Sequence, residues 1–227
     1  MIKGGEFLIK DQEAKDIFIP EEFGEDQLMM ASATKEFVEK ELDPHREQFE
    51  KKDYQLTEDC MKKAGELGLL GISVPSEYGG MGMPFNTSVL ICDKISGANG
   101  SFSTAFGAHT GIGTLPILLY GDDAQRKKYL PKLSTGEWMG CYCLTEPGAG
   151  SDANSGKTKA VLTKDGKYYL ITGQKMWISN AGFADVFIVF ARIEDDKNIT
   201  GFILEKEMEG ITMGEEEYKL GLNSSST

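Results

Sequence analysis

Residues 144–154, LTEPGAGSDAN, decide which folds are open to the chain, because a loop rich in Gly and Ser can hold a phosphate or a cofactor. The loop follows an apolar run, 137–145, that reads as a β-strand. A P-loop needs GxxxxGK[ST] before a helix, and this loop has no such lysine. A dinucleotide-binding loop needs GxGxxG before a helix, but Ala153 replaces the third glycine and a strand-like run follows. Both nucleotide folds are therefore excluded.

Before about residue 135, apolar residues recur with a helical period. A first helix is expected to end or kink at Pro44, and Thr57 is expected to cap a second that stops at Gly68. A small, apolar segment is expected to form one buried helix over 101–121. Two further helices are expected over 87–97 and from Asp122.

After about residue 135 the pattern becomes that of strands. Residues 157–163 and 167–172 predict a hairpin that turns at Asp165-Gly166. Residues 184–193 are apolar on both faces, as in a strand buried on both sides. Further strands are expected over 174–179 and 199–207. The prediction is an α+β fold: an all-helical domain, 1–135, followed by an antiparallel barrel-like or sandwich-like β-domain, 136–227.

Composition narrows the function classes. The formal net charge of −12 argues against nucleic acid as a partner, since phosphate binding needs clustered Lys and Arg. No apolar run is long enough to span a membrane. The four cysteines read as free thiols, which predicts a reducing, cytoplasmic location. His45 and His109 are too few for a metal site, so no metal is expected and His109 is read as a hydrogen-bonded core residue.

The remaining reading of the loop is a bed for a flat ligand. Gly148 and Gly150 would let a ligand approach the backbone, while Thr145 and Ser151 offer hydroxyls. On a strand over 174–179, Trp177 and Ser179 would share one face, where an indole can cover an aromatic ring. The alternative is a glycine-rich connection between strands beside a core tryptophan.

Several segments, in order and in register, resemble the acyl-CoA dehydrogenase family. The likeness begins near residue 24 and includes the two signature segments of the family. The matching segments are AGELGLLGISVPSEYGGMGM (64–83), GAHTGIGTLPI (107–117), YGDDAQRKKYLPKLSTGEW (120–138), CYCLTEPGAGSD (141–152), TGQKMWISNAG (172–182) and YKLGLNSSST (218–227).

The resemblance implies an FAD-dependent enzyme that removes two hydrogens from a saturated acyl-CoA in fatty acid β-oxidation and passes the electrons to an electron-transfer flavoprotein. It implies helical, β and C-terminal helical-bundle domains in a homotetramer or dimer. Thr145 would bond the flavin edge, Trp177 would pack on its ring, Ser179 would bond the reactive nitrogen or the ribityl-phosphate tail, and Ser151 would contact cofactor and CoA. The implied cofactor-binding set is Tyr142, Cys143, Leu144, Thr145, Gly150, Ser151, Trp177, Ile178 and Ser179.

No residue matches the catalytic base of the family, a glutamate of the C-terminal bundle, so no catalytic residue is assigned. The 227 residues are therefore interpreted as a fragment that is inactive alone. Two other functions stay open: an acyl-CoA oxidase or nitroalkane oxidase-like flavoenzyme, and a non-catalytic binding or assembly module.

The segment STAFGAHTGIG (103–113) resembles the branch that acts on long and very long acyl chains. The resemblance places Gly107 and Ala108 at the floor of the acyl pocket, beside the substrate, where small side chains would leave the pocket deep. Close packing of helices also selects Gly and Ala, so that explanation stays open.

Overall fold

Seven α-helices lie before residue 136 in the computed structural model, which describes residues 4–227. Their bounds are α1 Glu25–Phe37, α2 Arg46–Glu50, α3 Tyr54–Glu66, α4 Phe85–Ala98, α5 Gly100–Gly107, α6 Leu115–Tyr120 and α7 Asp123–Thr135. Short 3-10 turns and two π-helical segments, 38–42 and 108–113, join them. The helical first part of the fold is confirmed, and residues 1–3 of the predicted helical domain lie outside the described residues.

Side-chain caps explain where two of these helices begin. The Asp122 carboxylate accepts from Gln125 N at 2.8 Å, and the Gln125 amide oxygen accepts from Asp122 N at 2.9 Å, so α7 starts as expected. The expected start of α3 at Thr57 is wrong, because Asp53 accepts from Leu56 N at 3.1 Å and the helix begins three residues earlier, at Tyr54. Gly68, with φ at 75°, ends this segment as expected.

The single helix expected over 101–121 is wrong, because the chain there forms α5, the π-helical segment Ala108–Gly113 and α6. Thr110 Oγ1 donates to Phe106 O at 2.9 Å and Thr114 Oγ1 donates to His109 O at 2.8 Å. Such side-chain donors compete for helix carbonyls, and Pro116 lacks the amide hydrogen of a continuous helix. The end of the segment is also exposed rather than buried, since Tyr120 is 87% exposed.

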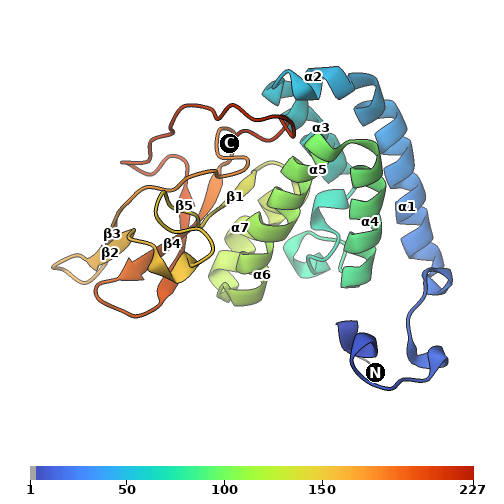
Figure 1. Cartoon of the computed structure of the whole chain (residues 1–227), viewed down its shortest axis with the longest axis horizontal. Coiled ribbons are helices and arrows are strands. Elements are labelled where there is room, and N and C mark those ends of the chain that lie inside the picture. Colours follow the sequence, from blue (N-terminus) through green and yellow to red (C-terminus); the bar gives the residue numbers. More distant parts are fainter. Residues whose placement is uncertain (1–3) are drawn as a thin grey trace.

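Five strands of the described chain form one mixed, open sheet (Figure 1). They are β1 Gly140–Cys143, β2 Lys159–Leu162, β3 Tyr169–Thr172, β4 Val186–Ile193 and β5 Ile199–Glu205. β4 pairs in parallel with β1 and β2 and antiparallel with β5, while β2 and β3 form the predicted antiparallel hairpin. The prediction of an antiparallel domain is corrected, since the long connection between β1 and β4 allows them to run parallel. The barrel is not confirmed.

Helices cover one face of this sheet. Leu130 and Leu133 of α7 and Ile117 of α6 pack in one buried cluster with Val186 and Ile188 of β4. Figure 1 shows α6 and α7 between the sheet and the other helices. On the opposite face, Cys141 and Cys143 lie in a second cluster with Phe187 and Val189. The expectation that β4 is buried on both faces is confirmed.

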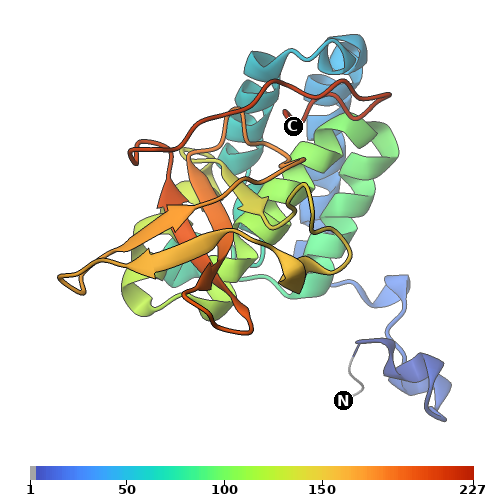
Figure 2. The same cartoon turned by 60° about the vertical axis from the view of Figure 1, so that its left-hand side comes forward.

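The last residues of the chain return to the helices. The segment after β5 runs over the helical layer near α2 and α3 (Figures 1 and 2). It is held there by Tyr54 Oη, which donates to the Glu216 carboxylate at 2.6 Å, and by Ser224 N, which donates to Ser101 Oγ at 2.7 Å. Within the described chain, none of the helices combines the length and the apolar character needed to cross a membrane.

Candidate functional site

The loop after β1 is organised around the carboxylate of Glu146, which is only 7% exposed. It accepts from Lys157 N at 2.6 Å and from Thr158 N at 3.1 Å. Burial raises the pKa of Glu146, but the hydrogen bonds from Lys175, Thr158 and Lys157 outweigh it and lower the pKa to about 2. Glu146 is therefore a charged anchor that folds residues 146–158 back on themselves.

Lys175 joins this loop to the second predicted segment. Its ammonium donates to Glu146 Oε1 at 2.7 Å and to Leu144 O at 3.1 Å, and its side chain is 12% exposed. Beside it, Met176 N donates to Thr145 O at 2.9 Å. These bonds bring together the two segments that sequence reasoning assigned to one ligand bed.

Trp177 does not lie on a strand, so the expected strand over 174–179 is wrong. Its φ is 59°, in the left-handed region, and that of Asn180 is 69°. The left-handed φ of Trp177 breaks the extended conformation that would place Trp177 and Ser179 on one face, and that of Asn180 prevents the strand from continuing past Ser179. Trp177 is nevertheless 64% exposed, which is unusual for so large an aromatic residue, and Ser179 is half-buried. Trp177 is thus a free aromatic surface beside Thr145, and the alternative of a core tryptophan is not what the fold shows.

The other predicted cofactor-binding residues divide into two groups. Tyr142, Leu144 and Thr145 are half-buried, and Tyr142 packs against Phe190 with ring centroids 4.9 Å apart. Cys143 and Ile178 are 5% and 9% exposed and lie in the cluster on the opposite face of the sheet. Cys143 and Ile178 therefore offer little surface to a ligand.

The glycine loop has room for a ligand. A Cβ built at Gly148 or Gly150 would meet no atom within 4 Å, so neither glycine is required by packing within the chain. Gly150 and Ser151 are both exposed. Open backbone, a hydroxyl at Ser151 and an uncovered indole at Trp177 are the donor set and surface that a flavin cofactor requires, so these residues fit FAD.

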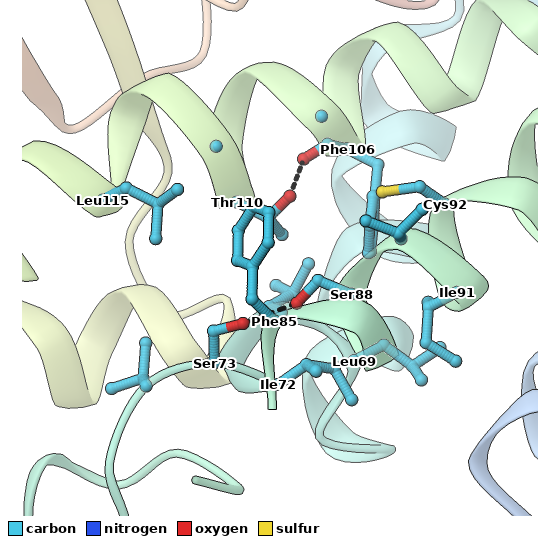
Figure 3. Close-up of a pocket in the computed structure, with 15 residues that line it drawn as sticks. Leu69, Ile72, Ser73, Phe85, Ser88, Ile91, Cys92, Phe106, Thr110 and Leu115 are labelled. Carbon is cyan, nitrogen blue, oxygen red and sulfur yellow. Dashed lines mark hydrogen bonds between the residues drawn. The ribbon is translucent and has the colours of Figure 1, made fainter. Parts of the chain in front are cut away.

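A second feature is an apolar pocket of about 230 Å³ between α4, α5 and the segment 69–74 (Figure 3). Its few hydroxyls are occupied, since Ser73 Oγ and Ser88 Oγ lie 2.5 Å apart and Thr110 donates to Phe106 O. An apolar ligand is therefore favoured. Gly107 lies in the pocket wall, whereas Ala108 is buried at 8% exposure and is not part of the wall.

His109 connects this pocket wall to β1. Its Nε2 donates to Leu133 O at 2.9 Å, and its Nδ1 accepts from Gly140 N at 3.0 Å, so the ring is neutral. Burial lowers the pKa of His109 to about 4, although the bond to Leu133 raises it. A Cβ at Gly113 would lie 2.8 Å from Gly140 C, which explains why glycine is needed where the two segments touch. The prediction of a hydrogen-bonded core histidine is confirmed.

Sequence reasoning missed the contribution of Lys175 to the site. Lys175 is a lone cation in GQKMWIS, and its pairing with Glu146 has no signal in local spacing. Asn180 and the final serines were also missed, although Ser224, Ser225 and Ser226 are each at most 1% exposed. A run of serines at a chain end usually predicts exposed coil, which hides such a cluster.

Comparison with known proteins agrees with this architecture. Residues 24–137 match the acyl-CoA dehydrogenase N-terminal domain, and residues 141–227 match the acyl-CoA dehydrogenase middle domain. The chain therefore belongs to the acyl-CoA dehydrogenase family.

Three relatives show how far the likeness extends. A probable acyl-CoA dehydrogenase of Bacillus subtilis is 48% identical over 99% of this chain and 38% of its own length. The crystal structure of an acyl-CoA dehydrogenase from Bacillus anthracis, complexed with FAD, superposes with a TM-score of 0.94 at 46% identity, over 100% of this chain and 38% of that one. A human very long-chain specific acyl-CoA dehydrogenase is 46% identical over 71% of this chain and 26% of its own length. The chain thus spans well under half of these relatives.

Proposed function

We propose that the chain is the flavin-binding and acyl-binding part of an FAD-dependent acyl-CoA dehydrogenase. The observation that carries this proposal is the joining of two segments by Lys175 and Glu146, which leaves Trp177 uncovered beside Thr145. FAD is the cofactor of the family, and the Bacillus anthracis relative was solved with it.

The proposed roles follow from exposure and chemistry. When bound, FAD would supply the acceptor for a hydride from the acyl chain. Trp177 would cover the ring, and the Thr145 hydroxyl and backbone would bond its edge. Ser179 would bond the reactive nitrogen of the flavin or the ribityl-phosphate tail. Ser151, exposed on the open loop, would contact both the cofactor and the CoA arm. Cys143, Leu144, Gly150 and Ile178 would contribute backbone surface, with Tyr142 behind them.

The apolar pocket is proposed to receive the acyl chain, and the acyl-CoA is proposed to be saturated and long. Two explanations for Gly107 were open, a deep pocket or close packing of helices. A Cβ at Gly107 would meet no atom within 4 Å, so packing does not require glycine there. This supports the pocket explanation for Gly107. Ala108 lies behind the wall and is proposed only to shape it.

Further parts of the proposal concern the whole protein. An electron-transfer flavoprotein would take the electrons, and the full protein would be a homotetramer or dimer that acts in fatty acid β-oxidation. The four free cysteines suit the reducing environment of the cytoplasm. The predicted domain boundary near residue 135 and the inactivity of these 227 residues alone belong to the same proposal.

The test is anaerobic addition of saturated acyl-CoAs to the gene product with any sequence that follows residue 227. Bleaching of the oxidised flavin band, greatest with long chains, is the expected result. In a parallel aerobic assay with the same acyl-CoAs, rapid oxygen consumption would favour an oxidase. A purified product without flavin would favour a binding module. A preference for butyryl-CoA would contradict the long-chain assignment. Turnover by residues 1–227 alone would contradict the assignment of the base to another segment.

A further inference from the structure

Asn180 lies at the point where three separate segments meet, and it is completely buried. Its Nδ2 donates to Ala105 O of α5 at 2.8 Å. Its Oδ1 accepts from Ser225 Oγ at 3.0 Å, and its backbone N–H donates to Ser226 O at 2.8 Å. Every polar atom of the side chain thus has a partner on another segment.

The residues next to Ala105 and Asn180 along the chain belong to the apolar pocket and to the Trp177 loop. Ala105 precedes Phe106 and Gly107, which line the apolar pocket. Asn180 itself follows Ser179 and lies three residues after the exposed Trp177. One side chain therefore links the pocket helix to the loop that presents the indole.

The residue type suits the position. Its φ of 69° is in the left-handed region, which asparagine tolerates better than most residues other than glycine. Glycine would adopt the same backbone but would leave the α5 carbonyl and Ser225 without this amide. Only a short side chain with both a donor and an acceptor satisfies both partners.

We propose that Asn180 is a positioning residue that fixes the Trp177–Ser179 loop relative to the acyl-pocket helix α5. The inference rests on the proposed function for its consequence, which is that the flavin and the acyl chain keep one relative position. It acts through its hydrogen bonds to Ala105 and Ser225, and it does not itself contact either ligand.

The first experiment compares hydrogen exchange in residues 1–227 and three variants. Asn180→Gly keeps the left-handed backbone and removes the amide. It should speed exchange about tenfold in two peptides, 174–184 and 102–110, and leave β4 and β5 unchanged. Glu194→Gly is the matched control, because Glu194 is also left-handed, with φ at 48°, but lies in the turn between β4 and β5. It should change neither peptide.

Ser225→Ala separates the two partners of the side chain. It removes the bond to Oδ1 and keeps the bond from Nδ2 to Ala105 O, so exchange should rise in the C-terminal segment and in 174–184 but not in 102–110. If Ser225→Ala affects 102–110 as strongly as Asn180→Gly, or if Asn180→Gly leaves 102–110 unchanged, the proposed link is wrong.

Flavin binding gives a readout that local loosening elsewhere would not move. Asn180→Gly should weaken FAD binding about tenfold and alter the visible circular dichroism of the bound flavin, while Glu194→Gly should do neither. If the unaltered chain binds no FAD, the proposed function is wrong, but the hydrogen-exchange result still tests whether Asn180 joins the Trp177–Ser179 loop to α5.

If Asn180→Gly does not fold, the test uses the unaltered chain alone. The side-chain amide hydrogens of Asn180 should then exchange as slowly as core amides, and exchange at the rate of a solvent-exposed amide would overturn the inference.

Discussion

Lys175 Nζ lies 2.7 Å from Glu146 Oε1, and both side chains are nearly excluded from solvent. This ion pair connects the loop after β1 to the segment that carries Trp177, 29 residues later. Replacing both partners of a buried ion pair with apolar residues changes the net stability little. Removing only one partner leaves the other as an uncompensated buried charge. The pair therefore makes the two segments depend on each other.

Replacement of one partner of this pair should cost more than replacement of both. Lys175→Met leaves the Glu146 carboxylate buried without its cation, and we expect a loss of about 3 kcal/mol in the free energy of unfolding. Glu146→Gln with Lys175→Met should recover part of that loss. Urea denaturation of the two single variants and the double variant measures the coupling. The exposed pair Lys127–Asp123 is the control, where Lys127→Met should cost under about 0.5 kcal/mol.

His109 should make the fold sensitive to acid. Its pKa of about 4 in the fold lies below the ordinary value of 6.5, so the unfolded chain binds a proton that the folded chain does not. The neutral His109 therefore contributes fully to the free energy of unfolding above pH 6.5. This contribution is lost as pH falls from 6.5 towards 4, at about 1.4 kcal/mol per pH unit. His109→Gln should reduce this slope in denaturation curves. Equal slopes in the unaltered chain and His109→Gln would contradict the assignment of this acid sensitivity to His109.

A large side chain at Gly107 should fill the pocket rather than disturb the fold. Gly107→Leu meets open space and replaces a poor helix former, so the unfolding free energy should stay within about 1 kcal/mol. Binding of palmitoyl-CoA should weaken, and the preference should move to shorter chains. Gly97→Leu is a matched control, because Gly97 is also helical with no atom within 4 Å of its Cβ position but lies outside the pocket. Unchanged chain-length preference in Gly107→Leu would exclude the pocket from acyl binding.

Regular elements were predictable where a local rule controls them. The capping pair Asp122 and Gln125 set the start of α7, and the apolar run of β4 set a central strand. The segment 174–179 was mistaken for a strand because apolar alternation carries no information about φ at Trp177. The parallel pairing of β1 with β4 depends on contacts 46 residues apart, which period alone does not specify.

The candidate site was also predictable only where local sequence carries the information. The two loops stand out by their glycines, hydroxyls and tryptophan, and the resemblance selects the same two segments, which hydrogen bonds join in the structure. The bonds that join them, from Lys175 to Glu146 and from Asn180 to Ala105, arise only after the chain has folded. Those bonds connect residues that local sequence patterns treat as unrelated.

The most direct measurement is titration of FAD into residues 1–227 and into Trp177→Ala, followed by flavin fluorescence and visible spectra. We expect one FAD per chain, with binding roughly tenfold weaker in Trp177→Ala because the ring loses its stacking surface, about 1.4 kcal/mol. Trp138→Phe, which alters the other tryptophan, should bind as the unaltered chain does. No saturable FAD binding, or equal binding by Trp177→Ala and the unaltered chain, would contradict the assignment of these two loops as the flavin bed.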